Sequence, residues 1–161
     1  MTSDSFLSPA ENFLALDEGH STPASAAVVV LPVPFEKTSS FGHGSANGPA
    51  AILEASHEVE LYDAVLYCEP FRAARGIATL CPMAVSAPNG ESLARALHES
   101  VRDWLSKGKF VVTLGGEHTS IVGAVSAHCD AFRELTILQF DAHSDLRPEY
   151  LGDPWSHACA M

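Results

Sequence analysis

The amino-acid sequence predicts an α/β fold built on a mainly parallel sheet. Three short apolar runs, at residues 26–31, 109–114 and 135–140, alternate with stretches of helical spacing, which is typical of such folds. Hydrophobic residues make up 47% of the chain and charged residues 18%, a composition that favours a globular protein. The length of 161 residues provides for one domain with a core. We expect residues 1–25 to be a loosely structured lead-in and residues 26–161 to belong to that domain.

The first strand and the first helix are predicted from local composition. Residues 26–31 (AAVVVL) are apolar and partly β-branched, which predicts a strand buried on both faces. We expect Pro32 and Pro34 to end this strand. After a loop rich in Gly, Ser and Thr, the spacing predicts a helix over residues 50–62, with Pro49 suited to its first turn.

The second half of the chain contains the clearest periodicity. Residues 63–82 contain short apolar pieces that predict no defined element, whereas residues 92–107 place apolar side chains on one stripe of a helix. Residues 109–114 (KFVVTL) predict a second buried strand, and a helical stretch over 119–128 follows. Residues 135–140 (LTILQF) predict a third strand. Ligands of parallel α/β sheets bind beyond the carboxyl ends of strands, and polar clusters follow the second and third runs.

Net charge and segment composition exclude several classes of function. Nine Lys and Arg residues against 20 Asp and Glu residues give a formal net charge of −11, which disfavours a nucleic-acid partner and suits a small cationic substrate. The chain lacks the run of roughly 18 apolar residues that a membrane span needs, and its start lacks the pattern of a secretory signal. Its four cysteines are scattered, so we expect reduced thiols in a cytoplasmic protein.

A candidate metal site follows the third predicted strand. In an extended segment, alternate side chains share a face, so Asp141, His143 and Asp145 of the sequence DAHSD can point the same way. Two carboxylates and an imidazole suit Mn²⁺ or Zn²⁺. Taken alone, such residues also serve as helix caps or turn formers. The second cluster, GGEHT at 115–119, favours the metal interpretation because His118 can reach the same crevice.

These motifs resemble those of the ureohydrolase (arginase/agmatinase) family. The family signatures G-G-[DE]-H-S and D-A-H-x-D are matched by GGEHT and by FDAHSD, with Thr119 where Ser is usual. The stretches ENFLALDE, TSSFGHGSANGPAAILEAS, VELYD and LRPEYLGDPWSHACAM also look similar to agmatinases. The resemblance implies a three-layer α/β/α fold that is incomplete at its C-terminus. A further family motif, D-x-D-x-x-D-P, does not occur in the chain, so we expect the N-terminal half of a ureohydrolase that is nearly inactive alone.

The resemblance also implies a chemistry and a set of roles. It assigns His118, Asp141 and Asp145 to one Mn²⁺ ion, and Asp141, as a bridge, with His143 to a second. In the family, a hydroxide between the two ions attacks the guanidinium carbon of the substrate, and urea and an amine leave. His157 falls where the family often carries a histidine that shuttles a proton or contacts substrate. Glu117 is expected to brace His118 or to contact backbone.

The stretch after the DAHSD motif indicates the substrate. Arginases resemble one another there in an Asn-containing stretch that contacts the substrate's α-carboxylate, and residues 146–150 (LRPEY) lack that Asn. We therefore expect agmatine as the substrate, with putrescine and urea as products, while other guanidino acids such as guanidinobutyrate stay open. A homo-oligomer is expected for a complete form. Two alternatives are a non-catalytic fragment or pseudoenzyme that binds a partner subunit, and a different metal hydrolase such as a phosphoesterase.

Overall fold

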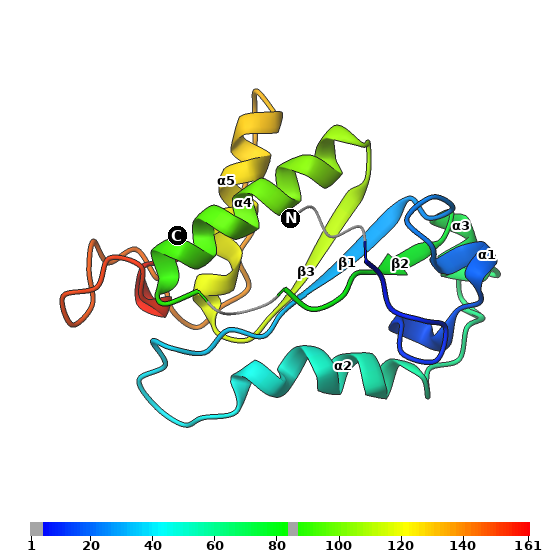
Figure 1. The fold of residues 1–161 in the computed structure, drawn as a ribbon, viewed down its shortest axis with the longest axis horizontal. Coiled ribbons are helices and arrows are strands. Elements are labelled where there is room, and N and C mark those ends of the chain that lie inside the picture. Colours follow the sequence, from blue (N-terminus) through cyan, green and yellow to red (C-terminus); the bar gives the residue numbers. More distant parts are fainter. Residues whose placement is uncertain (1–4, 84–86) are drawn as a thin grey trace.

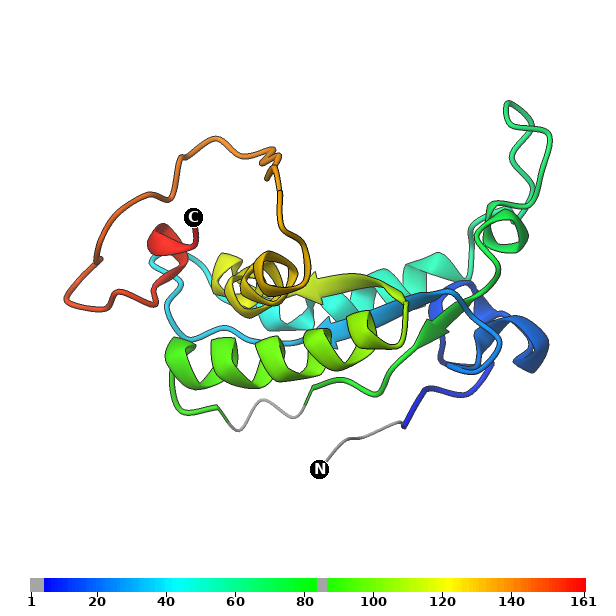
Figure 2. The ribbon, with the colours of Figure 1, turned by 90° about the horizontal axis from the view of Figure 1, so that it is seen from above.

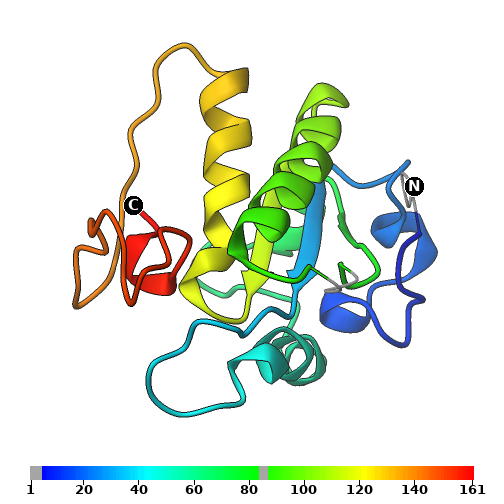
Figure 3. The ribbon, with the colours of Figure 1, turned by 60° about the vertical axis from the view of Figure 1, so that its left-hand side comes forward.

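The computed structural model describes residues 5–83 and 87–161, which form three layers. A parallel sheet lies between α2 on one face and α4 with α5 on the other (Figures 1 and 3). In these ranges the sheet has three strands in the order β2-β1-β3, and β1 pairs parallel with both neighbours. The strands are β1 (Val28–Val33), β2 (Ile77–Thr79) and β3 (Phe110–Gly115). The predicted three-layer α/β/α class is confirmed.

The helices connect these strands and cover the sheet. They are α1 (Glu18–Ser21), α2 (Gly48–Ser56), α3 (Pro70–Ala73), α4 (Gly90–Ser106) and α5 (Val122–Ala131), with short 3₁₀ turns η1 (Phe13–Ala15), η2 (Ser45–Asn47), η3 (His118–Ile121) and η4 (His157–Cys159). The helices predicted over 92–107 and 119–128 therefore correspond to α4 and to η3 with α5. The helix predicted over 50–62 starts two residues earlier and ends at Ser56. Within the described residues, none of the helices combines the length and apolar character that crossing a membrane requires.

Strand β1 runs through Pro32 instead of ending before it, so the expected stop at the prolines is wrong. Pro32 lies opposite Leu114 in the β1–β3 ladder. Its carbonyl accepts a hydrogen bond from Met83 N at 2.9 Å, which places it on the β2 side of the strand. The N–H that Pro32 lacks would point to the same side, past Thr79, where β2 has ended. Proline is tolerated there because no ladder hydrogen bond is lost.

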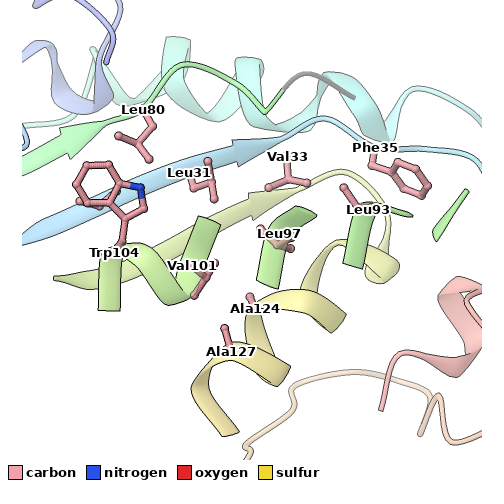
Figure 4. Packing of buried hydrophobic residues seen from close by; sticks show 11 residues of the cluster. Leu31, Val33, Phe35, Leu80, Leu93, Leu97, Val101, Trp104, Ala124 and Ala127 are labelled. Carbon is pink, nitrogen blue, oxygen red and sulfur yellow. The ribbon is translucent and has the colours of Figure 1, made fainter. Parts of the chain in front are cut away.

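The hydrophobic core lies between β1 and α4. Alternate residues of β1 point at the helices because side chains of a strand alternate between faces, and α4 presents an apolar stripe to them (Figure 4). The stripe continues onto α5 through Ala124 and Ala127. Gly123 lets the two helices approach closely, since a Cβ at this position would lie 2.2 Å from the carbonyl oxygen of Ala94. The core residues are Val29, Leu31, Val33, Phe35, Leu80, Leu93, Leu97, Val101, Trp104, Ala124 and Ala127.

The third strand was predicted in the wrong place. Residues 135–140 form an irregular, exposed segment, with Leu138 77% and Phe140 91% exposed. They lie in the long loop that leaves the end of α5 and returns to the C-terminal end (orange to red in Figure 2). A strand requires a neighbouring backbone to pair with, and within the described ranges no segment pairs with these residues. The third strand is instead β2, from the stretch 63–82 where the sequence predicted no element.

Candidate active site

Three of the predicted metal ligands lie together. His118 Nδ1 is 2.5 Å from Asp145 Oδ2 and 3.6 Å from Asp141 Oδ2. One potential ligand atom from each of the three residues lies within 4.8 Å of the others. All three side chains are partly buried, so solvent screens their interactions only in part. Two carboxylates and an imidazole at this spacing provide a donor set that suits a divalent cation.

Gly116, the residue directly after β3, positions His118. Gly116 N donates to Val33 O at 3.1 Å and Glu117 N donates to Phe35 O at 2.9 Å. A Cβ on Gly116 would lie only 2.3 Å from Phe35 O, so the chain can turn here only without a side chain. His118 then begins η3, which packs against α4 and α5. The imidazole is therefore held by the packed body of the protein.

The two aspartates come from the irregular segment after residue 140. Asp141 Oδ1 accepts a hydrogen bond from His143 N at 2.8 Å. This backbone N–H lowers the pKa of Asp141 most, and the side chain of Gln139 and the charges of His118 and His143 lower it further against the opposing effect of burial. Asp145 has a positive φ of 47°, a turn conformation that Asp tolerates better than most residues.

The structure does not bring His143 into the three-residue group. Its side chain is 80% exposed, and its Nδ1 lies 3.5 Å from Asp141 Oδ1. It nevertheless lines the same cleft as the group. That cleft has a volume of about 590 Å³, and His118, Asp141, Asp145, Arg147, Tyr150 and His157 are among its lining residues. The candidate metal ligands and the candidate proton-carrying histidine therefore face one space.

His157 is tied by hydrogen bonds to the Gly-, Ser- and Thr-rich loop that precedes α2. Its Nδ1 lies 3.1 Å from Thr38 Oγ1, and its backbone N donates to the same oxygen at 2.8 Å. The ring of Tyr150 meets the imidazole edge-on, with 5.7 Å between ring centroids. Thr38 is thus a site residue that sequence reasoning missed. Its only signal is its position in the Gly-, Ser- and Thr-rich loop, which does not distinguish one hydroxyl from the next.

Glu117 holds this loop. Of its two expected roles, bracing His118 or contacting backbone, the structure shows the second. The backbone N–H groups of Lys37, Thr38 and Ser39 donate to Glu117 Oε2 at 2.9, 2.8 and 3.0 Å. Thr38 Oγ1 donates to the other carboxylate oxygen at 2.8 Å. Glu117 is only 7% exposed, so these hydrogen bonds compensate for burying a carboxylate.

Glu36 secures the neighbouring part of the same loop. Gly44 N and Ala46 N donate to its carboxylate at 2.9 and 3.0 Å, and His43 Nδ1 lies 3.1 Å from Oε1. The backbone N–H of Ala46 contributes most to lowering the pKa of Glu36 from 4.5 to about 2, with Gly44, Ser45 and His43 adding to it against the effect of burial. Two carboxylates therefore fasten the loop that borders the cleft.

The fold and the side chains at the cleft define an α/β protein whose candidate site lies beyond the carboxyl ends of parallel strands. A model of the arginase family matches residues 26–161. The chain belongs to the arginase family.

Relatives and solved structures agree with this assignment. The chain is 38% identical to N(1)-aminopropylagmatine ureohydrolase of Synechocystis sp., covering 97% of this chain and 52% of that protein. It is 33% identical to agmatinase of Bacillus anthracis, covering 88% and 48%. The crystal structure of agmatine ureohydrolase of Thermoplasma volcanium superposes with a TM-score of 0.70 at 28% identity, covering 87% and 46%. The chain spans about half the length of the curated relatives it matches.

Proposed function

We propose that this chain contributes to the hydrolysis of a small cationic guanidino substrate to urea and an amine. The observation that carries the proposal is the cleft in which His118, Asp141 and Asp145 face the same space as His157. This pairs a cation-binding group with a residue that can transfer a proton. The arginase-family match and the ureohydrolases among the relatives support it.

We further propose Mn²⁺ as the metal. His118, Asp141 and Asp145 would hold one ion, and Asp141 with His143 would contribute to a second. The fit rests on the three ligand atoms that already lie within 4.8 Å of one another. When bound, a divalent ion acts as a Lewis acid and makes water reactive at neutral pH.

The chain's own residues would bind the substrate and manage its proton. The formal net charge of −11 favours the approach of a cationic guanidinium group to the protein. Hydrolysis breaks a carbon–nitrogen bond, and the departing amine needs a proton on its nitrogen. His157 lines the cleft and an imidazole can deliver that proton near neutral pH. The edge-on contact with Tyr150 would hold the imidazole in orientation for this transfer.

Agmatine is the proposed substrate, and N(1)-aminopropylagmatine is the second candidate. The second candidate is favoured because the relative from Synechocystis sp., 38% identical to this chain, is an N(1)-aminopropylagmatine ureohydrolase. Both compounds are cations, and neither has the α-carboxylate of arginine. Arg147 also lines the cleft, where its guanidinium lies 5.7 Å from the centroid of the Tyr150 ring. If Arg147 instead pairs with substrate, a guanidino acid such as guanidinobutyrate will be hydrolysed fastest.

The first test is metal binding followed by urea release. Isothermal titration with MnCl₂ should show that Asp145→Asn weakens binding at least about tenfold. The matched control Glu149→Gln removes an exposed charge of the same stretch and should leave affinity within about twofold. Equal affinity in wild type and Asp145→Asn would contradict the proposed ligand set.

Urea release is then measured from agmatine, N(1)-aminopropylagmatine, guanidinobutyrate and arginine with and without Mn²⁺. We expect slow release from the 161-residue chain that requires Mn²⁺ and that Asp145→Asn abolishes. Metal binding with no urea from any substrate would favour the non-catalytic alternative, in which the chain serves a partner subunit. Fastest release from arginine would contradict the agmatine assignment.

A further inference from the structure

Thr38 connects a buried carboxylate to the imidazole of His157. On one side, Thr38 Oγ1 lies 2.8 Å from Glu117 Oε1. On the other side, it lies 2.8 Å from His157 N and 3.1 Å from His157 Nδ1. Glu117 is buried between η3 and the loop, and three backbone N–H groups fix its orientation. The hydroxyl therefore has defined partners on both sides.

The number of hydrogens available at Thr38 determines which partner donates. A hydroxyl carries one hydrogen, and an ionised carboxylate can only accept. The hydrogen of Thr38 must therefore point at Glu117. The His157 backbone N–H occupies one acceptor direction of the oxygen. Only an Nδ1 that carries a proton can form the remaining contact as a hydrogen bond, since an unprotonated Nδ1 would set two lone pairs against each other.

The same count of hydrogens determines whether the other ring nitrogen of His157, Nε2, carries a proton. A neutral imidazole that carries its proton on Nδ1 has an unprotonated Nε2. The hydroxyl of Ser40 lies 3.5 Å from that atom, and both residues line the cleft. The hydroxyl of Ser156 lies 3.2 Å from Nδ1, and it can rotate to accept from that atom as well.

We propose that Glu117 is a positioning residue that fixes the tautomer of His157 through the hydroxyl of Thr38. His157 then presents an unprotonated Nε2 to the cleft, ready to take up a proton and to release it to a leaving amine. This inference rests on the proposed function for its catalytic meaning. The tautomer itself can be measured without any turnover.

The test reads the tautomer directly by nuclear magnetic resonance. Long-range ¹H–¹⁵N spectra of the uniformly labelled 161-residue chain separate protonated from unprotonated ring nitrogens. His157 is assigned by the signal that disappears in His157→Gln. Spectra are compared at pH values above the imidazole titration, which the same series locates. In wild type we expect the Nδ1–H form to predominate.

Glu117→Gln should reverse this preference. The side-chain amide nitrogen of Gln can donate to Thr38 Oγ1, which frees the hydroxyl hydrogen to point at His157 Nδ1 and favours the Nε2–H form. We expect the tautomer ratio to change by about tenfold, as when a charge-assisted hydrogen bond changes direction. The matched control is Glu36→Gln, which removes the other carboxylate that fastens the loop without touching Thr38, and it should leave the ratio unchanged.

A second pair of variants applies if Glu117→Gln does not fold. Thr38→Val removes the hydroxyl at nearly constant shape and should shift the ratio, whereas Thr38→Ser should preserve it. A wild-type His157 that carries its proton on Nε2 would overturn the proposal, as would a ratio that neither Glu117→Gln nor Thr38→Val changes. Absence of urea release would contradict the proposed function and leave the tautomer result intact, so the two failures can be told apart.

Discussion

Replacing Gly116 by alanine should loosen the turn that carries His118. The added Cβ would lie 2.3 Å from Phe35 O and 3.2 Å from the Cα of Ala46. Ordinary van der Waals contact needs about 3.5 Å, so the two backbones must separate by about 1 Å. Both neighbours are backbone atoms, which cannot rotate away as the end of a flexible side chain can.

The cost follows from the hydrogen bonds at this contact. Separation by about 1 Å breaks the bonds from Gly116 N to Val33 O and from Glu117 N to Phe35 O, at about 1 kcal/mol each. Strain that remains adds about 1 kcal/mol, so Gly116→Ala should lower the free energy of unfolding by about 3 kcal/mol. That is a large share of the roughly 5–15 kcal/mol that stabilises a typical domain.

Urea unfolding followed by circular dichroism measures this effect. The matched control is Gly48→Ala, because a Cβ at Gly48 would lie 3.8 Å from Gly115 O, in ordinary contact, and Gly48 is the first residue of α2. Gly48→Ala should be neutral or raise stability by up to about 1 kcal/mol. Unfolding of Gly116→Ala at the same urea concentration as wild type would show that the close approach of Phe35 O does not constrain the turn.

Two further predictions concern pH and packing. The pKa of Glu36 is about 2 against an ordinary 4.5, so its ionised carboxylate stabilises the fold above pH 4.5, and this stability is lost as pH falls from 4.5 through 2. The urea midpoint of unfolding of Glu36→Gln should therefore change less across this pH range than that of wild type. An equal change of midpoint with pH in both proteins would contradict the role of the carboxylate. Leu97→Ala should cost about 2–5 kcal/mol because Leu97 is fully buried against the sheet, whereas Leu138→Ala should cost less than about 0.5 kcal/mol because that side chain is exposed. A large loss of stability in Leu138→Ala, measured in the same urea series, would show that residues 135–140 pack against the protein after all.

The elements that sequence patterns predicted well are those with a complete local signal. The apolar stripe of α4 shows a period that only a helix explains, and Asn89 caps it by accepting a hydrogen bond from Ser92 N at 3.0 Å. The runs that became β1 and β3 are long enough to indicate buried strands. Strand β2 has three residues, which is too short for a periodic pattern. Residues 135–140 have the composition of a strand, but composition does not specify a pairing partner.

The residues of the candidate site also differ in whether local sequence could nominate them. His118, Asp141 and Asp145 belong to two short motifs, so local sequence was enough to nominate them. The contact between Thr38 and His157 joins residues 119 positions apart. Nothing in the local sequence of either residue specifies this contact, because it depends on how Glu117 turns the loop toward η4. Tertiary contacts of this kind follow from the fold and not from a motif.

The two halves of the candidate metal site differ in how firmly they are held. His118 follows β3 and lies against packed helices, whereas Asp141 and Asp145 belong to a segment that carries no helix or strand. Such a segment opens at a lower free energy than the core. An ion that uses both halves must then supply the free energy that orders the aspartates, and its apparent affinity falls by the fraction of molecules in which they are already in place. Cation affinity at this cleft would thus report local unfolding as much as ligand chemistry.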